Sequence, residues 1–348
     1  MDLMTDQAPS APALRYDLRF EGSGGEFFKI WIVNLALTIV TLGVFSAWAK
    51  VRSTRYFYGN TYIGDHSFDY HADPVRILIG RIIALAALIA YSLASAFAPL
   101  LGVLFAIILL IATPWLVISA LRFNARNSSY RNIRFGFDAE YGEAAHTYVL
   151  WPLFAAFTLF TTWPLARRAQ LQFNINHHSF GGKPFEAEIP GKAIYGSYGF
   201  GLLVFFILML VAMPLAGFIG AASGASNVAV GTMIYMAAGA AMVIAVTFTS
   251  TLVFNLAIGH TILAGRFRFE SDLSPVMVIW LFVSNLALML VTLGLFYPWA
   301  RVRMARYTAA CLAVTGPADM DGFASELVAG QGAIGEEIAS FFDVDVGL

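Results

Sequence analysis

Two short basic segments carry the most distinctive chemistry of the chain. The strings WAKVRSTRY, from Trp48, and WARVRMARY, from Trp299, place basic side chains at matching offsets. These side chains are Lys50, Arg52, Arg55, Arg301, Arg303 and Arg306. On a helix they spread around the axis, and the planar guanidinium group of Arg suits phosphate oxygens. The pattern predicts contact with lipid phosphates at a membrane face, with simple interfacial anchoring as the alternative interpretation.

A second candidate site lies in the string DHSFDYHAD, which begins at Asp65. Side chains two residues apart share one face of an extended strand, so Asp69, His71 and Asp73 would lie together there. Carboxylates and imidazoles are ligands of divalent transition metals. The string therefore offers a metal site, and a solvated polar hairpin is the alternative interpretation.

Signatures of catalysis are missing from the sequence. It contains no G-x-S-x-G string, no H-E-x-x-H string and no Walker loop. Its single cysteine, Cys311, excludes an intrachain disulfide and a zinc site of four cysteines. A G-x-G-x-x-G string at 330–335 has no βαβ pattern around it. We therefore expect a protein that is not an enzyme and that holds no cofactor.

The composition indicates the environment in which these residues work. The 348 residues are 59% hydrophobic and 12% charged, with a mean hydropathy of +0.71. Soluble proteins are roughly a quarter charged, and a soluble domain of this length could not hide so much apolar surface from water. These values exclude a cytosolic enzyme, a secreted disulfide-rich domain and a nucleic-acid-binding protein. They predict a multi-pass membrane protein.

Seven stretches are apolar and long enough to cross a hydrocarbon core about 30 Å thick. They are residues 28–48, 77–98, 100–121, 147–166, 197–221, 228–258 and 276–299. The backbone inside lipid must satisfy its own hydrogen bonds, which a helix does. We therefore predict an all-α polytopic membrane protein with about seven hydrophobic helices, internal repeats and short extramembrane β-hairpins.

The chain resembles itself at several places. Residues 34–56 match residues 285–307 at 15 of 23 positions, and a fainter copy covers residues 151–173. Short polar segments with alternating aromatic residues, such as NTYIGDHSFDY from Asn60, predict β-hairpins outside the membrane. The expected organisation is a disordered tail (1–17), two membrane repeat units (18–134 and 135–266), a partial third unit (267–307) and an acidic tail (308–348).

Tryptophans near the ends of the predicted helices are expected to act as interfacial anchors. They are Trp31, Trp48, Trp151, Trp163, Trp280 and Trp299. Trp31 and Trp48 lie 17 residues apart, which is about 26 Å along a straight helix. Seven crossings, favoured by this spacing, leave 12 of the 21 basic residues on one side, whereas segments that dip in and return leave all 21 there. We expect seven crossings, with the C-terminus inside the cell.

Two functional hypotheses stay open. The predicted helices carry no ionisable residue near their centres, which disfavours a proton- or sodium-coupled pump. One hypothesis is a permease- or channel-like transporter of an uncharged or weakly polar solute, because internal repeats commonly build transporters. The alternative is a non-transporting envelope scaffold or lipid-interacting protein. The expected partners are membrane phospholipids, anionic ones above all, and no nucleic acid; a homo-oligomer is left open.

Three segments together resemble a known family. They are FEGSGGEFFKIWIVNLALTIVTLGVFSAWAKVRSTRYFYGNT from Phe20, FNARNSSYRNIRFGFD from Phe123 and the terminal IGEEIASFFDVDVGL. They are similar to segments of the YjgN family of bacterial inner-membrane proteins. The resemblance implies a polytopic inner-membrane protein of a Gram-negative bacterium. The family is a domain of unknown function, so the resemblance supplies no catalytic or binding residues. We also expect the terminal string to form a short amphipathic piece that docks on the basic hairpin loops.

Overall fold

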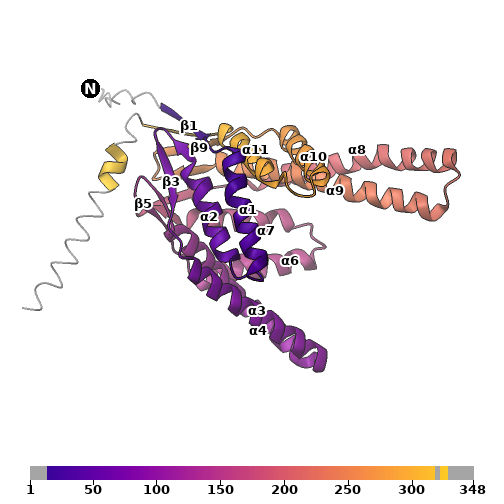
Figure 1. The fold of residues 1–348 in the computed structure, drawn as a ribbon, viewed down its shortest axis with the longest axis horizontal. Helices are drawn as coiled ribbons and strands as arrows, with labels where there is room; N and C mark the ends of the chain where they lie inside the picture. Colours follow the sequence, from indigo (N-terminus) through magenta and orange to yellow (C-terminus); the bar gives the residue numbers. More distant parts are fainter. Residues whose placement is uncertain (1–13, 318–321, 328–348) are drawn as a thin grey trace, which may run out of the picture.

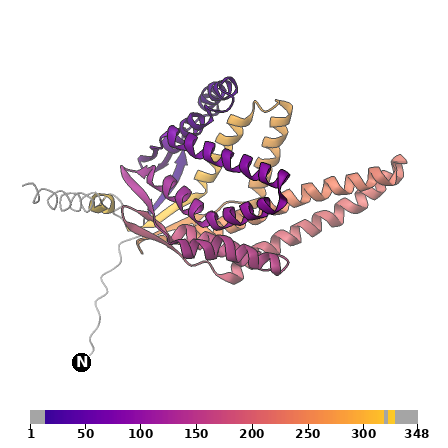
Figure 2. The same cartoon turned by 90° about the horizontal axis from the view of Figure 1, so that it is seen from below.

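The structure, a computed structural model, describes residues 14–317 and 322–327. A small β-barrel forms one end of the molecule, and helical hairpins project from it (Figures 1 and 2). Residues 14–17, which we expected in the disordered tail, form the start of a strand. The expected docking of IGEEIASFFDVDVGL concerns residues 334–348, which lie outside the described residues.

Ten strands close into one antiparallel barrel within the described residues. They are β1 (Leu14–Phe20), β2 (Thr61–Ile63), β3 (His66–Tyr70), β4 (Ser128–Tyr130), β5 (Ile133–Phe137), β6 (His178–Phe180), β7 (Lys183–Ala187), β8 (Thr261–Leu263), β9 (Phe267–Ser271) and β10 (Leu312–Gly316). Their order around the barrel is β1-β10-β9-β8-β7-β6-β5-β4-β3-β2. The prediction of an all-α fold is therefore wrong.

The barrel exists because an isolated hairpin leaves unpaired N–H and C=O groups on both of its edges. Neighbouring hairpins satisfy these groups by pairing with each other. Phe68 of β3 pairs with Tyr130 of β4, and Phe135 of β5 pairs with Phe180 of β6. Each pairing joins strands more than forty residues apart, so inspection of one hairpin at a time does not reveal its partner.

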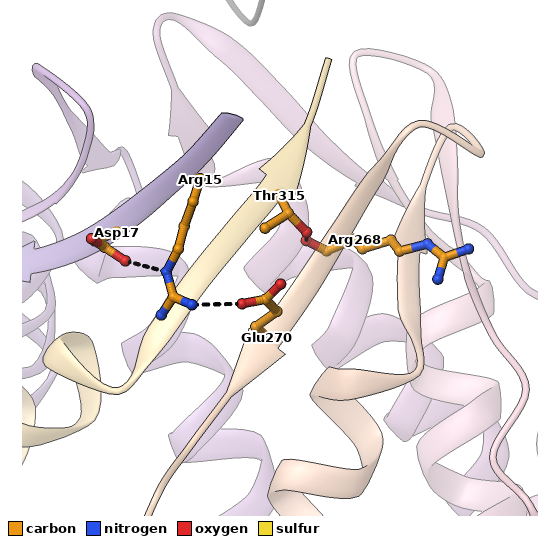
Figure 3. Close-up of polar contacts among 5 residues, drawn as sticks. All are labelled: Arg15, Asp17, Arg268, Glu270 and Thr315. Carbon is orange, nitrogen blue, oxygen red and sulfur yellow. Dashed lines mark hydrogen bonds and ion pairs between the residues drawn. The ribbon is translucent and has the colours of Figure 1, made fainter. Parts of the chain in front are cut away.

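The barrel closes where β1 meets β10, in a register that runs from Leu14↔Gly316 to Asp17↔Ala313. On the outer face, Arg15 reaches from β1 across β10 to β9, as Figure 3 shows. Its Nη1 lies 2.9 Å from Oε2 of Glu270, and its Nε lies 2.8 Å from Oδ1 of Asp17. The hydrogen bond to Asp17 and the attraction of both carboxylates raise the pKa of the Arg15 guanidinium. These groups are exposed, so their attraction to one another is weakened by water.

Five helical hairpins connect the strands in the described part of the chain. They pair α1 (Gly24–Val40) with α2 (Ser46–Gly59), α3 (Pro74–Phe97) with α4 (Pro99–Arg126), α5 (Tyr141–Ala145), the π-helical turn η1 (His146–Leu150) and α6 (Trp151–Phe157) with α7 (Trp163–Asn176), α8 (Gly191–Ser223) with α9 (Asn227–Gly259), and α10 (Pro275–Val291) with α11 (Tyr297–Ala310). Each hairpin leaves the end of one strand and returns to the start of the next. All five therefore project from the same end of the barrel, which we call the helical end; the β-turns lie at the far end (Figure 1).

The prediction of seven crossing helices is also wrong, because three of the predicted helices are broken by turns. In the first of them, α1 ends at Val40, Leu42 has φ 49° and Gly43 has φ 94°. The N–H of Gly43 donates to the carbonyl of Thr38 at 2.8 Å, a bond that closes a helix C-terminus. The last hairpin turns in the same way, with Gly294 at φ 89°. The Thr-Leu-Gly string is thus a helix stop that the tryptophan spacing concealed.

Two of the hairpins are long enough to cross a bilayer twice each. Among the described residues, four helices have the length and apolar composition of membrane spans, namely α3, α4, α8 and α9. These four helices have 24 to 33 residues, or about 36–50 Å at the helical rise. Figure 1 shows the α3–α4 and α8–α9 hairpins as two arms that diverge from the barrel. The α10 helix is apolar but shorter.

The helices return to the barrel through a recurring cap. The side-chain Nδ2 atoms of Asn60 and Asn127 donate to the carbonyls of Tyr56 and Phe123, each at 2.7 Å. The Nδ1 atoms of His177 and His260 lie 2.8 Å from the carbonyls of the residues four positions earlier. A short polar side chain at each of these positions satisfies a helix carbonyl and ends the helix where its strand begins.

Apolar side chains fill the far end of the barrel. Ile133 is fully buried and Phe267 is 2% exposed there. A helical turn formed by residues 322–327 covers this end of the barrel and buries Phe323 and Leu327 against the strands. The rings of Phe267 and Phe323 have centroids 4.9 Å apart. The barrel is therefore packed at its far end by the chain segment that follows β10.

Candidate functional site

In every hairpin, the charged residues lie toward the barrel and the tip is uncharged. Each hairpin contains one long stretch without Asp, Glu, Lys or Arg, and this stretch includes its tip. These stretches are 30–49, 82–121, 144–166, 193–265 and 273–300. All 21 Lys and Arg residues lie in the described residues and on the barrel side of the tips. The structure thus places all the basic residues on one side of the hairpin tips. This is the arrangement expected if the segments dip into the membrane and return.

The predicted basic residues form a layer between the barrel and the hairpin tips. Lys50 and Arg301 each precede the last residue of their helix by nine positions, or about 14 Å along the axis. Both side chains are exposed. The Arg301 guanidinium lies 5.0 Å from the centre of the Phe57 ring and donates to the Tyr297 hydroxyl at 3.1 Å. These two residues are the predicted bases that best suit an external phosphate.

Arg52 and Arg303 are instead held by buried asparagines on the paired helix. Arg303 Nη1 donates to Oδ1 of Asn285 at 2.7 Å, and Arg52 Nη1 donates to Oδ1 of Asn34 at 3.2 Å. Both asparagines are buried. Each contact ties the returning helix of a short hairpin to its outgoing helix. The repeated strings therefore encode a hydrogen bond within the hairpin, which the sequence pattern did not reveal.

Arg55 and Arg306 contact the backbone of the barrel. Arg55 Nε donates to the carbonyl of Tyr70 at 3.2 Å, and Arg306 Nη2 donates to the carbonyl of Gly22 at 3.0 Å. Arg122 Nε reaches the carbonyl of Phe137 at 3.3 Å. These arginines hold returning helices to the chain near the ends of strands, although parts of their side chains remain exposed.

The three predicted metal ligands are not assembled into a site. Strand β3 ends at Tyr70, so His71 and Asp73 leave the face on which Asp69 lies. His71 Nε2 lies 2.8 Å from the Ser129 hydroxyl, and Asp73 caps α3 by accepting from the N–H of Val75. No three His, Cys, Asp or Glu residues are grouped for metal binding in the part of the chain that the structure describes.

The tryptophans do not bracket straight rods. The turn after α1 separates Trp31 from Trp48, so both lie on one hairpin that bends back between them. Trp299 packs beside Gly24, where an added Cβ atom would come within 2.2 Å of its ring. The anchor prediction also named Trp151, Trp163 and Trp280. Trp151 and Trp163 flank the tip of the third hairpin, and Trp280, on α10, is 61% exposed.

The interior of the barrel contains an apolar chamber that the sequence interpretation missed. Its volume is about 210 Å³. It is lined by Ile63, Phe68, Tyr130, Phe135, Phe180, Phe185, Leu263, Phe267, Phe269, Val314, Phe323 and Ala324.

A second chamber of about 390 Å³ adjoins the first and lies at the helical end. The two chambers share Phe68 and Phe135. The outer one is also lined by Leu18, Tyr58, Thr61, Asn124, Ala125, Ser128 and His178. Burial lowers the pKa of the His178 imidazole, and neighbouring His177 lowers it further, against a hydrogen bond to Asn174 that raises it. The neutral form of the His178 imidazole, which lines the outer chamber, is therefore favoured.

One signal in the sequence could have identified these chambers. The second strand of each internal hairpin carries a phenylalanine at its third position: Phe68, Phe135, Phe185 and Phe269. Alternation places this residue on the same face of every hairpin. The alternation alone assigns this aromatic face to no partner, because strands of three and five residues acquire an interior only when the sheet closes.

Comparisons with known proteins agree with the membrane architecture. The chain matches the family described as "Bacterial protein of unknown function (DUF898)" over residues 15–341. It is 31% identical over 123 residues to the inner membrane protein YjgN of Salmonella typhimurium, which covers 35% of this chain and 31% of that protein. It is 30% identical over 120 residues to YjgN of Escherichia coli K12, covering 34% and 30% of the two chains. No solved structure matches the chain.

The similar stretch thus spans about a third of the curated relatives that it matches. Their shared name and the four membrane-length helices confirm the predicted location in the bacterial inner membrane. The predicted resemblance to the YjgN family is confirmed as well. Since the family match extends over most of its length, this chain belongs to the DUF898 family of bacterial proteins.

Proposed function

We propose that the protein is a lipid-interacting membrane protein whose hairpins insert from the cytoplasmic face and whose barrel stands in the cytoplasm. The observation that carries the proposal is the position of all 21 Lys and Arg residues on the barrel side of the hairpin tips. Basic residues collect on the cytoplasmic side of inner-membrane proteins and are attracted to anionic lipids there. Of the exposed bases, Lys50 and Arg301 are those proposed to contact lipid phosphates, because Arg52, Arg55 and Arg306 donate to Asn34 or to backbone carbonyls.

The lengths of the hairpins support a protein that sits mainly on one leaflet. The α3–α4 and α8–α9 hairpins reach far beyond the basic layer, whereas α2 extends only four residues beyond Lys50 before the turn, or about 6 Å. The tips of the short hairpins carry Leu42 and Leu293, both more than 90% exposed. Apolar tips at this distance suit the boundary between headgroups and acyl chains.

The exposure of the long helices favours this proposal over the permease hypothesis. At most 28% of the span window of any of these four helices is buried. A path for a solute requires helices that enclose it, and the two long hairpins diverge from each other (Figure 1). The permease hypothesis rested on internal repeats. We infer that the repeated unit is a strand pair with its helical hairpin, because the caps at Asn60, Asn127, His177 and His260 recur. Such units build the closed barrel.

Counting bound lipids tests the lipid contact. The full-length protein is reconstituted into nanodiscs of phosphatidylcholine and phosphatidylglycerol, and native mass spectrometry counts the phosphatidylglycerol that it retains. Each basic residue near a surface contributes about 1 kcal/mol to binding anionic lipid, or roughly a five-fold change in affinity. A variant with both Lys50→Gln and Arg301→Gln should therefore retain clearly less phosphatidylglycerol. The matched control is Lys183→Gln, at the far end of the barrel; equal retention in the two variants contradicts the proposal.

Cysteine labelling tests the orientation. In a Cys311→Ser background, Asp65→Cys at a far-end turn should react with an impermeant maleimide only after the inner membrane is opened. Leu42→Cys, at the tip of the first hairpin, should stay unreactive because it lies in lipid. Labelling of residue 65 in spheroplasts with an intact inner membrane would place the barrel on the outer side and end the proposal.

A further inference from the structure

Four phenylalanine rings line the inner chamber, and two of them, Phe68 and Phe135, also line the outer chamber. The ring centroids of Phe68 and Phe135 are 6.5 Å apart, and those of Phe135 and Phe185 are 6.4 Å apart. Phe269 continues the row at 5.9 Å from Phe185. Each ring comes from the second strand of a different hairpin. Phe68 and Phe135 therefore lie between the apolar inner chamber and the polar-rimmed outer chamber, and Phe185 and Phe269 continue the row along the inner one.

We propose that the barrel interior binds the hydrocarbon chain of a single-chain amphiphile with an uncharged, hydrogen-bonding head, of the fatty-alcohol class. The chain would occupy the inner chamber, whose lining is apolar apart from the Tyr130 hydroxyl, and that hydroxyl donates to the carbonyl of Ile63 at 2.8 Å. The head would lie in the outer chamber beside Tyr58, Asn124 and Ser128. This site goes beyond the proposed binding of phosphates by exposed bases, since it uses none of those residues.

The charge of the lining selects the head group. Neither Lys, Arg, Asp nor Glu lines either chamber. A charged head drawn into such a space would lose its hydration without gaining an opposite charge, which is costly. Hydroxyl and amide groups can instead exchange hydrogen bonds with a neutral polar head. The lining therefore favours an alcohol over a fatty acid anion.

The ends of the barrel select the direction of entry. At the far end, the helical turn 322–327 places Phe323 and Ala324 against the inner chamber. An added Cβ atom on Gly181 would come within 2.9 Å of the Leu327 side chain, so this closure is tightly packed. At the helical end, the outer chamber is lined by residues near the ends of α2 and α4, which lead to the membrane. The open route runs toward the bilayer, where amphiphiles of this class dissolve.

Photolabelling tests the site. The full-length protein in nanodiscs is exposed to a C16 fatty alcohol that carries a diazirine near the end of its chain, and mass spectrometry maps the adducts. We expect adducts on strand peptides such as 66–70 and 133–137. The matching diazirine palmitate, an anion at neutral pH, should label these peptides at least five-fold less. Equal labelling by the two probes would contradict the uncharged head, and adducts confined to the helices would overturn the site.

Two variants that fill the inner chamber separate binding from general labelling. Ala324→Phe and Val314→Phe both add a ring to its wall and should lower labelling of the strand peptides at least ten-fold. Glu326→Gln is the control on the same helical turn, because its carboxylate lies outside the chamber, 3.7 Å from Arg266. Unchanged labelling in whichever filling variant keeps the wild-type thermal midpoint would overturn the proposal. Phosphatidylglycerol retention reports separately on the exposed bases, so either proposal can fail alone.

Discussion

The barrel and the helical arms remove their apolar residues from water in different ways. In the barrel, the Ile133 and Phe267 side chains are almost inaccessible, so the protein itself removes them from water. On the arms, Phe97 is 86% exposed and Leu210 is 75% exposed. Such side chains gain nothing by packing against a neighbouring helix when lipid is as apolar as they are. The barrel is thus a core that folds by the hydrophobic effect, whereas the arms acquire their apolar surroundings from the membrane.

The contacts within the arms agree with this division. Small residues allow close approach at points where two arm helices touch, beside one aromatic contact between Tyr91 and Phe105. An added Cβ atom on Gly102 would come within 2.5 Å of the Ser95 hydroxyl, and one on Gly201 within 1.8 Å of the Thr249 hydroxyl. Close backbone approach at small residues is how helices associate in lipid. The barrel instead relies on large aromatic side chains, which are effective where water is the competitor.

The largest expected effect tests this comparison directly with one substitution in each region. Phe267→Ala should destabilise the barrel by about 3–5 kcal/mol, as expected for the loss of a buried aromatic side chain. Phe218→Ala, on α8 where the ring is 71% exposed, should leave stability nearly unchanged, because lipid replaces the lost contacts. Thermal midpoints of the two variants in nanodiscs provide the measurement. Equal shifts would mean that the arms are packed as tightly as the barrel.

A smaller effect should appear at the base of the short hairpins. Asn285→Ala removes an acceptor from Arg303 and a donor to the Ala300 carbonyl, which should cost about 1–3 kcal/mol. Asn34→Ala should cost less, because the Arg52 bond is longer and the buried Nδ2 of Asn34 has no hydrogen-bond partner among the described residues. The two variants are compared by thermal midpoint under identical conditions. A larger loss for Asn34→Ala would show that the two hairpins are not held in the way that their geometry indicates.

The smallest effect is a pH dependence confined to the barrel. Burial lowers the pKa of His178 in the folded protein, whereas an unfolded histidine has a pKa of about 6.5. The unfolded chain therefore binds the proton more readily, and stability should fall as the pH drops below about 6.5. His178→Gln should remove this part of the dependence when thermal midpoints are measured at pH 7.5 and 5.5. His66→Gln, at an exposed site, is the control that should retain it.

Several features of the fold followed from the sequence alone. The uncharged stretches around the hairpin tips and the length of α3, α4, α8 and α9 are consequences of composition. The Thr-Leu-Gly string is a further sequence signal, because its glycine can end a helix. In the structure the N–H of Gly43 donates to the carbonyl of Thr38. The spacing of Trp31 and Trp48 outweighed it in our interpretation, because a straight helix and a bent one give the same count of residues.

The candidate sites show a similar division. Contact of Lys50 and Arg301 with lipid phosphates stays a prediction, whereas the attachment of Arg303 to Asn285 depends on a helix that returns antiparallel to the first. The predicted grouping of Asp69, His71 and Asp73 assumed that side chains alternate along one strand. Strand β3 ends at Tyr70, so the alternation does not extend to His71 and Asp73. No local rule states where a short strand stops, because that point is set by its neighbours in the sheet.

The amino-acid sequence by itself determined which parts of this protein need lipid, since hydropathy and charge act locally and do not depend on the fold. Only the tertiary structure decided that the short hairpins join into one barrel, that its aromatic faces meet, and that a chamber of about 210 Å³ remains between them. The physical reason is that strand edges and apolar faces are satisfied by partners distant in the chain. Which partners meet is fixed only when the barrel closes.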